Sequence, residues 1–128
     1  MTKSTTFVLA IMISFMLSGC GVGSPIHQTA TYNRLQSEIL GNNNNLMTIK
    51  IGMTQEQVLQ HMGQPERSEG YKWGLAWLYR TAMTSGIYGT ADNDFTPVVF
   101  DENGKLVGWG RNFFTVHVKR YEVKVKQE

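Results

Sequence analysis

The segment Ile49–Pro65 constrains the fold most strongly, because it carries the start and stop signals of a short helix in the right order. Thr54 suits the N-cap position, and Gln57 three residues later completes a capping box. Gly63 suits a left-handed C-cap. The apolar residues between these signals repeat at helical spacing, and they are Val58, Leu59 and Met62. The sequence therefore predicts a capped two-turn helix that follows a strand and a glycine turn.

The same segment resembles the signature of the SmpA/OmlA (BamE-like) family of small bacterial outer-membrane lipoproteins. The resembling residues are Ile51 through Val58 and Leu59 through Pro65. The resemblance implies an α+β fold in which two short helices pack on a three-stranded antiparallel sheet, with a fourth strand left open. It also implies a non-enzymatic, periplasm-facing accessory role in envelope integrity or in the assembly of β-barrel outer-membrane proteins, with the β-barrel assembly machinery as a candidate partner.

The N-terminus predicts export and lipid attachment. Phe7 to Leu17 is an apolar run interrupted only by Ser14, and it is too short to span a bilayer, so it fits the apolar region of a signal peptide. The residues after it resemble a bacterial lipobox that ends in Cys20, the single cysteine of the chain. We therefore expect residues 1–19 to be a signal peptide and Cys20 to carry a diacylglycerol on its sulfur and an acyl chain (palmitate or a relative) on its nitrogen. An exported protein with a free thiol, or a protein with an apolar N-terminal helix, is the alternative.

Several acyl chains at one residue make a lasting anchor, since each buried methylene contributes about 0.8 kcal/mol. Gly21 follows the cysteine where an aspartate favours inner-membrane retention in enteric bacteria, so the periplasmic face of the outer membrane is the expected location. Residues 20–30 are predicted to be a flexible tether, because glycine, serine and proline are frequent there. Residues 31–128 are then the folded domain.

Two segments around the capped helix carry their own patterns. Residues 31–40 have apolar residues near helical spacing and predict a first helix that stops at Gly41, before a polar loop of four asparagines. Residues 71–81 alternate aromatic and other side chains, which predicts one long strand with its aromatic face toward the core.

The C-terminal half predicts more sheet. Residues 82–94 contain several turn-forming residues and predict a long, mobile connection. Residues 95–100 and 106–114 are strand candidates joined by a hairpin turn at 101–105. Residues 116–126 alternate valines with a change of parity, which fits either a fourth edge strand with a bulge or a frayed tail.

No group of residues has the spacing of a catalytic or metal site. The net charge of +2 is spread along the chain, which argues against nucleic acid as a partner. The three histidines lack metal-ligand spacing, and Asp92–Asp94 lacks the glycine and distal glutamate of an EF-hand loop. We therefore expect no enzymatic activity, no metal, and no cofactor apart from the covalent lipid.

A partner-binding surface is the remaining candidate site. Its expected residues are aromatic or basic and lie around a glycine-flanked tryptophan: Trp109, Arg111, Phe113 and Phe114. The alternative to an assembly role comes from the fold, which also resembles β-lactamase inhibitor proteins. On that interpretation the domain binds or inhibits a periplasmic enzyme.

Overall fold

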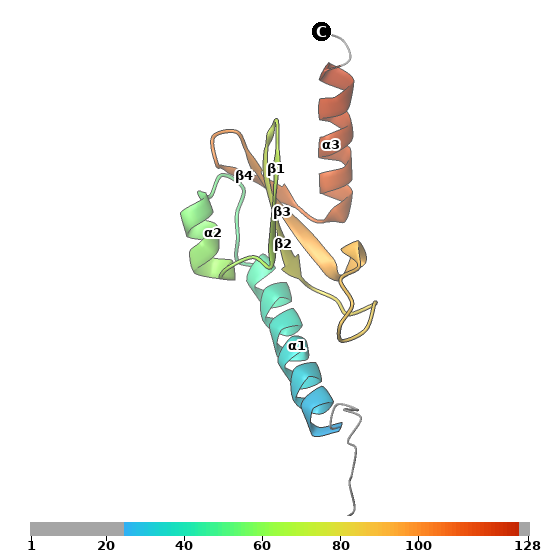
Figure 1. The fold of residues 1–128 in the computed structure, drawn as a ribbon. Coiled ribbons are helices and arrows are strands. Elements are labelled where there is room, and N and C mark those ends of the chain that lie inside the picture. The colour runs from blue at the N-terminus through green and yellow to red at the C-terminus, as the bar shows by residue number, and fades with distance from the viewer. Residues whose placement is uncertain (1–24, 126–128) are drawn as a thin grey trace, which may run out of the picture.

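The computed structural model describes residues 25–125 and shows an α+β fold with three α-helices and one four-stranded antiparallel sheet (Figure 1). In chain order the elements are α1 (Pro25–Leu46), α2 (Gln55–Met62), β1 (Arg67–Tyr71), β2 (Gly74–Arg80), the 3₁₀ helix η1 (Asp92–Asp94), β3 (Phe95–Asp101), β4 (Leu106–Trp109) and α3 (Arg111–Val125). Within this part of the chain, none of the helices combines the length and the apolar character needed to span a bilayer.

The strands form a meander in the order β1-β2-β3-β4, so each strand pairs with its neighbours in the sequence. The outer side of β4 is covered by the segment that leads into α2. There the Gly52 N–H donates to the Leu106 carbonyl at 2.7 Å, and the Leu106 N–H donates to the Met53 carbonyl at 2.8 Å. These bonds attach the start of α2 to the sheet edge, which protects that edge from pairing with other strands.

The main core lies between the first face of the sheet, α2 and the end of α1. Its buried residues are Leu46, Ile49, Val58, Met62, Trp77, Tyr79, Val98, Phe100 and Leu106. The predicted capping box of α2 is present, since Thr54 Oγ1 accepts from the Gln57 N–H at 3.2 Å and the Thr54 N–H donates to Gln57 Oε1 at 2.9 Å. At the other end of α2, the buried Tyr79 hydroxyl donates to the Gly63 carbonyl at 2.9 Å. The segment Ile49–Pro65, which carries the clearest helix signals in the sequence, thus also contributes buried residues to the main core on the first face of the sheet.

The second face of the sheet is covered by α3, which stands on the opposite side from α2 (Figure 1). The Phe113 ring lies directly over Gly108, where a Cβ atom would come within 2.6 Å of the ring carbons. Trp73, in the β1–β2 turn, has its ring centroid 4.6 Å from that of His117 and 4.7 Å from that of Tyr71. Phe114 and Tyr121 complete this aromatic cluster. The cluster fixes α3 to the sheet, and burial together with nearby Arg120 lowers the pKa of His117.

The C-terminal segment is therefore a helix, and the prediction of a fourth strand or a frayed tail at 116–126 was wrong for the described residues up to Val125. The predicted strand at 106–114 ends at Trp109, because Gly110 adopts a positive φ of 98° and the chain turns into α3. The fourth strand of the sheet is instead β1. It arises because residues 71–81, expected to be one strand, turn at Lys72–Trp73 into the β1–β2 hairpin.

The N-terminal predictions also need correction. The first helix runs from Pro25 to Leu46, well beyond the predicted 31–40, and the asparagine run 42–45 is part of it. The flexible tether predicted for residues 20–30 is helical from Pro25 onward. Residues 20–24, including the predicted lipid-attachment residue Cys20, lie outside the described residues.

Candidate functional site

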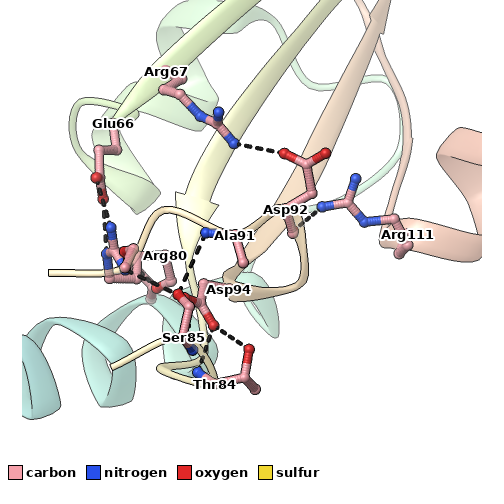
Figure 2. Close-up of polar contacts among 11 residues, drawn as sticks. Glu66, Arg67, Arg80, Thr84, Ser85, Ala91, Asp92, Asp94 and Arg111 are labelled. Atoms are coloured by element: carbon pink, nitrogen blue, oxygen red, sulfur yellow. Dashed lines mark hydrogen bonds and ion pairs between the residues drawn. The ribbon is translucent and has the colours of Figure 1, made fainter. Parts of the chain in front are cut away.

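A network of charged and hydroxyl side chains lies at one end of the sheet, where β2 ends and β3 begins (Figure 2). Between these strands lies the segment 82–91, which we call the β2–β3 loop, followed by η1. The sequence predicted a long and mobile connection here. The structure instead shows a loop held by charged and hydroxyl side chains, with two of its anchoring residues fully or almost fully buried.

Asp94 is the centre of this network. Its side chain is completely buried. Its carboxylate accepts from the Thr84 N–H at 2.5 Å, from the Thr84 hydroxyl at 2.6 Å, and from the N–H and the hydroxyl of Ser85. The hydrogen bonds from Ser85 and Thr84 outweigh desolvation and lower the pKa of Asp94 to about 2. The carboxylate is therefore ionised at neutral pH and binds the first residues of the loop through four donors.

Arg80 supplies the buried positive charge of this network. Its guanidinium binds the Glu66 carboxylate through two bonds of 2.9 and 3.1 Å, and its Nη1 lies 3.8 Å from Asp94 Oδ2. The same Nη1 donates to the Gly89 carbonyl at 3.1 Å, which fixes the last part of the loop. The bidentate contact with Glu66 is the main reason that the pKa of Arg80 is raised. Arg80 is thus a permanent cation between two carboxylates.

Helix α1 is fastened to the same end of the sheet. The Asn42 side-chain amide donates to the Arg80 carbonyl at 2.8 Å, and the Asn43 amide donates to the Thr81 carbonyl at 3.0 Å. Arg80 is the last residue of β2 and Thr81 follows it, so both carbonyls lie where the strand ends. Two residues of the asparagine run therefore satisfy backbone groups at the start of the loop.

The tip of the loop projects from this network. The Gly89 N–H donates to the Gly86 carbonyl at 3.1 Å, which closes a turn around Ile87 and Tyr88. Gly86 adopts a positive φ of 84°, a conformation that glycine adopts without a steric penalty. The Tyr88 residue is 75 % exposed. The buried charges thus hold a loop that presents an aromatic side chain to its surroundings, which is an arrangement typical of binding loops.

A second set of contacts joins the network to α3. Arg67 forms an ion pair with Asp92 at 3.2 Å, and its guanidinium lies over the Phe95 ring at 4.4 Å. Arg111 donates to the Asp92 carbonyl and, at 3.1 Å, to the Phe95 carbonyl. Both arginines therefore hold η1 in place between the sheet and the start of α3 (Figure 2).

The four residues predicted to bind a partner do not form one surface. Trp109 pairs with Val98 and packs against the main core on the first face of the sheet. Arg111 is engaged with η1, and Phe113 and Phe114 hold α3 on the second face. An exposed apolar residue close to this group in the sequence is Val116, which is 56 % exposed on α3. The predicted residues thus support the start of α3, and Val116 marks the accessible surface beside them.

Arg80, Asp94 and the ordering of the loop were not predicted from the sequence. A signal was present in Arg80, a charged residue at the end of an otherwise apolar and aromatic strand, because such a residue needs a buried partner. Asp94 was considered only as a cation ligand, in the Asp92–Asp94 run. Among residues 25–125 no three His, Cys, Asp or Glu side chains group together at a spacing that would hold a metal ion.

Comparison with known proteins places the chain in one family. The family model described as a protein of unknown function (DUF3192) matches residues 20–116, which is more than half of the chain. No curated protein and no solved structure matches the chain. The match covers α1, α2, the whole sheet and the start of α3, and its first residue is Cys20.

Proposed function

The chain belongs to the DUF3192 family, and from this premise we propose that it is a lipid-anchored protein of the bacterial outer membrane whose domain serves as a protein-interaction module on the periplasmic face. The observation that carries the proposal is the position of α1. This helix begins five residues after Cys20, and its other end is bonded to the sheet by Asn42 and Asn43. A lipid on Cys20 would therefore hold the domain through a helix of 22 residues, about 33 Å long.

Three further features support the anchor. The apolar run Phe7–Leu17 and the small residues after it suit a lipoprotein signal peptide. The family match begins at Cys20, the residue that would become the new N-terminus. The cysteine has no second cysteine to pair with, so lipid attachment gives it a role that a disulfide cannot.

The internal contacts of the buried charged groups support an interaction role for the domain. The buried charges Arg80 and Asp94 are engaged in internal contacts that position backbone. The resemblance to the SmpA/OmlA family suggests an accessory role in envelope integrity or β-barrel assembly. We place the protein contact on the exposed surface of α3 around Val116, because this exposed apolar residue follows the aromatic and basic residues of the β4–α3 junction closely in the sequence.

Two measurements test this proposal. Labelled palmitate should enter the wild-type protein and not the Cys20→Ser variant, and label in the variant would refute the anchor. A photo-crosslinking residue at Val116 should capture an envelope protein from intact cells, whereas the same residue at the exposed Gln60 on α2 is the matched control on the opposite side of the sheet. Equal capture from both positions would refute a specific surface on α3.

The identity of the captured protein separates the two interaction roles. Components of the β-barrel assembly machinery would support the accessory role. A soluble periplasmic hydrolase would support the alternative, in which the domain binds or inhibits an envelope enzyme.

A further inference from the structure

The β2–β3 loop differs in composition from the rest of the domain surface. Its ten residues, Ala82 to Ala91, include no charged side chain, although 22 of the 128 residues of the chain are Lys, Arg, Asp or Glu. The side chains at its tip are Ile87, which is half-buried, and Tyr88, which is 75 % exposed. An exposed tyrosine beside an aliphatic residue, with no charge nearby in the loop, suits the boundary between lipid and water, where tyrosine is enriched.

The loop also lies at the end of the domain from which α1 departs. Asn42 and Asn43 bond α1 to the carbonyls of Arg80 and Thr81, where the loop begins. From that point α1 runs away from the sheet toward Pro25, and the loop extends from the sheet on the same side (Figure 1). The β3–β4 turn around Glu102 lies at the other end of β3 and therefore at the opposite end of the sheet.

The distance from the anchor to α1 is short. Five residue steps separate Cys20 from Pro25, and a fully extended chain covers at most about 18 Å over that length. The first turn of α1 must therefore stay close to a membrane that holds Cys20. The residues of α1 between Gln28 and Asn33 carry no charge, and Tyr32 among them is 44 % exposed. The first turns of α1, nearest to the anchor, and the β2–β3 loop on the same side of the sheet thus both present uncharged residues, at 28–33 and 82–91.

We propose that the β2–β3 loop contacts the bilayer that holds Cys20, with Ile87 and Tyr88 at the level of the lipid headgroups. The inference rests on the lipid anchor of the proposed function and goes beyond it, since it assigns the domain a second contact with the membrane and hence an orientation. The Asp94 and Arg80 contacts hold the loop in the shape that makes this contact. The opposite end of the sheet then faces the periplasm.

The single cysteine makes a direct test available. In the lipidated protein the Cys20 sulfur is blocked as a thioether, so Tyr88→Cys provides one thiol for an environment-sensitive fluorophore such as NBD. The protein is reconstituted in phosphatidylcholine vesicles, because an uncharged loop needs no anionic lipid. The matched control is Glu102→Cys, an exposed position in the β3–β4 turn. We expect the label at residue 88 to shift its emission to shorter wavelength and to be quenched by a lipid-borne quencher, and the label at residue 102 to do neither.

The possible outcomes separate the lipid anchor from the loop contact. Two labelled thiols per molecule would show that Cys20 is free, which refutes the anchor and the inference with it. One labelled thiol and equal emission from residues 88 and 102 would leave the anchor in place and refute the loop contact. Shielding of residue 88 in whole envelopes but not in lipid vesicles would show that the loop faces a protein, which also overturns the inference.

Discussion

Replacing Gly108 by alanine tests the packing of α3 on the sheet. A Cβ atom at this position would lie 2.6–2.7 Å from three ring carbons of Phe113. Carbon atoms in ordinary contact are about 3.5–4.0 Å apart, so the ring must move by about 1 Å. Overpacking of this kind costs about 1–3 kcal/mol, and alanine recovers up to about 1 kcal/mol through its smaller loss of backbone entropy on folding. We expect Gly108→Ala to lower the free energy of unfolding by about 1–2 kcal/mol, measured by urea denaturation.

The control is the same substitution at Gly41. This residue lies within α1, and a Cβ there would meet no atom within 4 Å. Because alanine favours the helix by about 0.8–1.0 kcal/mol over glycine, Gly41→Ala should stabilise the protein. The two substitutions therefore have opposite expected signs, although their chemistry is identical.

A double mutant assigns the cost of Gly108→Ala to Phe113. Phe113→Ala alone should destabilise the domain because it removes an aromatic ring from the face of the sheet. Once the ring is absent, Gly108→Ala should no longer cost free energy, so the two changes should deviate from additivity by about 1–2 kcal/mol, within the range for side chains in contact. Additive effects would refute the contact and, with it, the packing of α3 over Gly108.

The remaining predictions concern the main core, the cap of α2 and the loop network. Tyr79→Phe should lower the free energy of unfolding by about 1–2 kcal/mol, because the Gly63 carbonyl loses its donor, and a change below about 0.3 kcal/mol in a denaturant titration would contradict the bond. Thr54→Ala should cost about 1 kcal/mol through loss of the N-cap, with unchanged stability as the contrary result. The lowered pKa of Asp94 adds stability that is complete above its ordinary value of 3.8 and is lost as the pH falls to about 2, so the stability difference between wild type and Asp94→Asn should shrink over that interval. A difference that stays constant with pH would exclude Asp94 as its source.

The elements that the sequence predicted well are those specified by local signals. The α2 helix has its N-cap, its capping box and its stop at the expected residues, because each depends on contacts within a few positions. The turn before β4 was also predicted, and Gly104 there has the positive φ of 71° that the Asn-Gly pair indicated. For the described residues the α+β class is confirmed, with a sheet of four strands.

The elements that were predicted wrongly are those in which two periodicities compete. Apolar and aromatic residues continue to alternate across the β1–β2 turn, at Tyr71, Trp73 and Leu75. A two-residue repeat therefore could not reveal that the chain reverses at residues 72–73. In α3 the valines alternate as in a strand. The spacing of Phe113, Phe114, His117 and Tyr121, which places them on one side of a helix, was the signal for the observed structure, and their contacts with Trp73 and Gly108 outweigh the low helix propensity of valine.

The candidate site was only partly accessible from the sequence. Exposure could not be read from residue type, so Trp109 was expected at a surface although it packs against the core. The network of Glu66, Arg80 and Asp94 joins residues that are 14 or more positions apart in the chain, and no local pattern reports such a contact. The loop that these residues hold, with Tyr88 at its tip, became a candidate surface only when the fold was known.

The intact mass of the mature protein purified from envelopes shows directly whether Cys20 carries a lipid anchor. We expect a chain that begins at Cys20 and carries the mass of a diacylglycerol and one acyl chain, with both modifications on the N-terminal peptide. A mature chain that begins elsewhere, or a Cys20 without lipid, would contradict it.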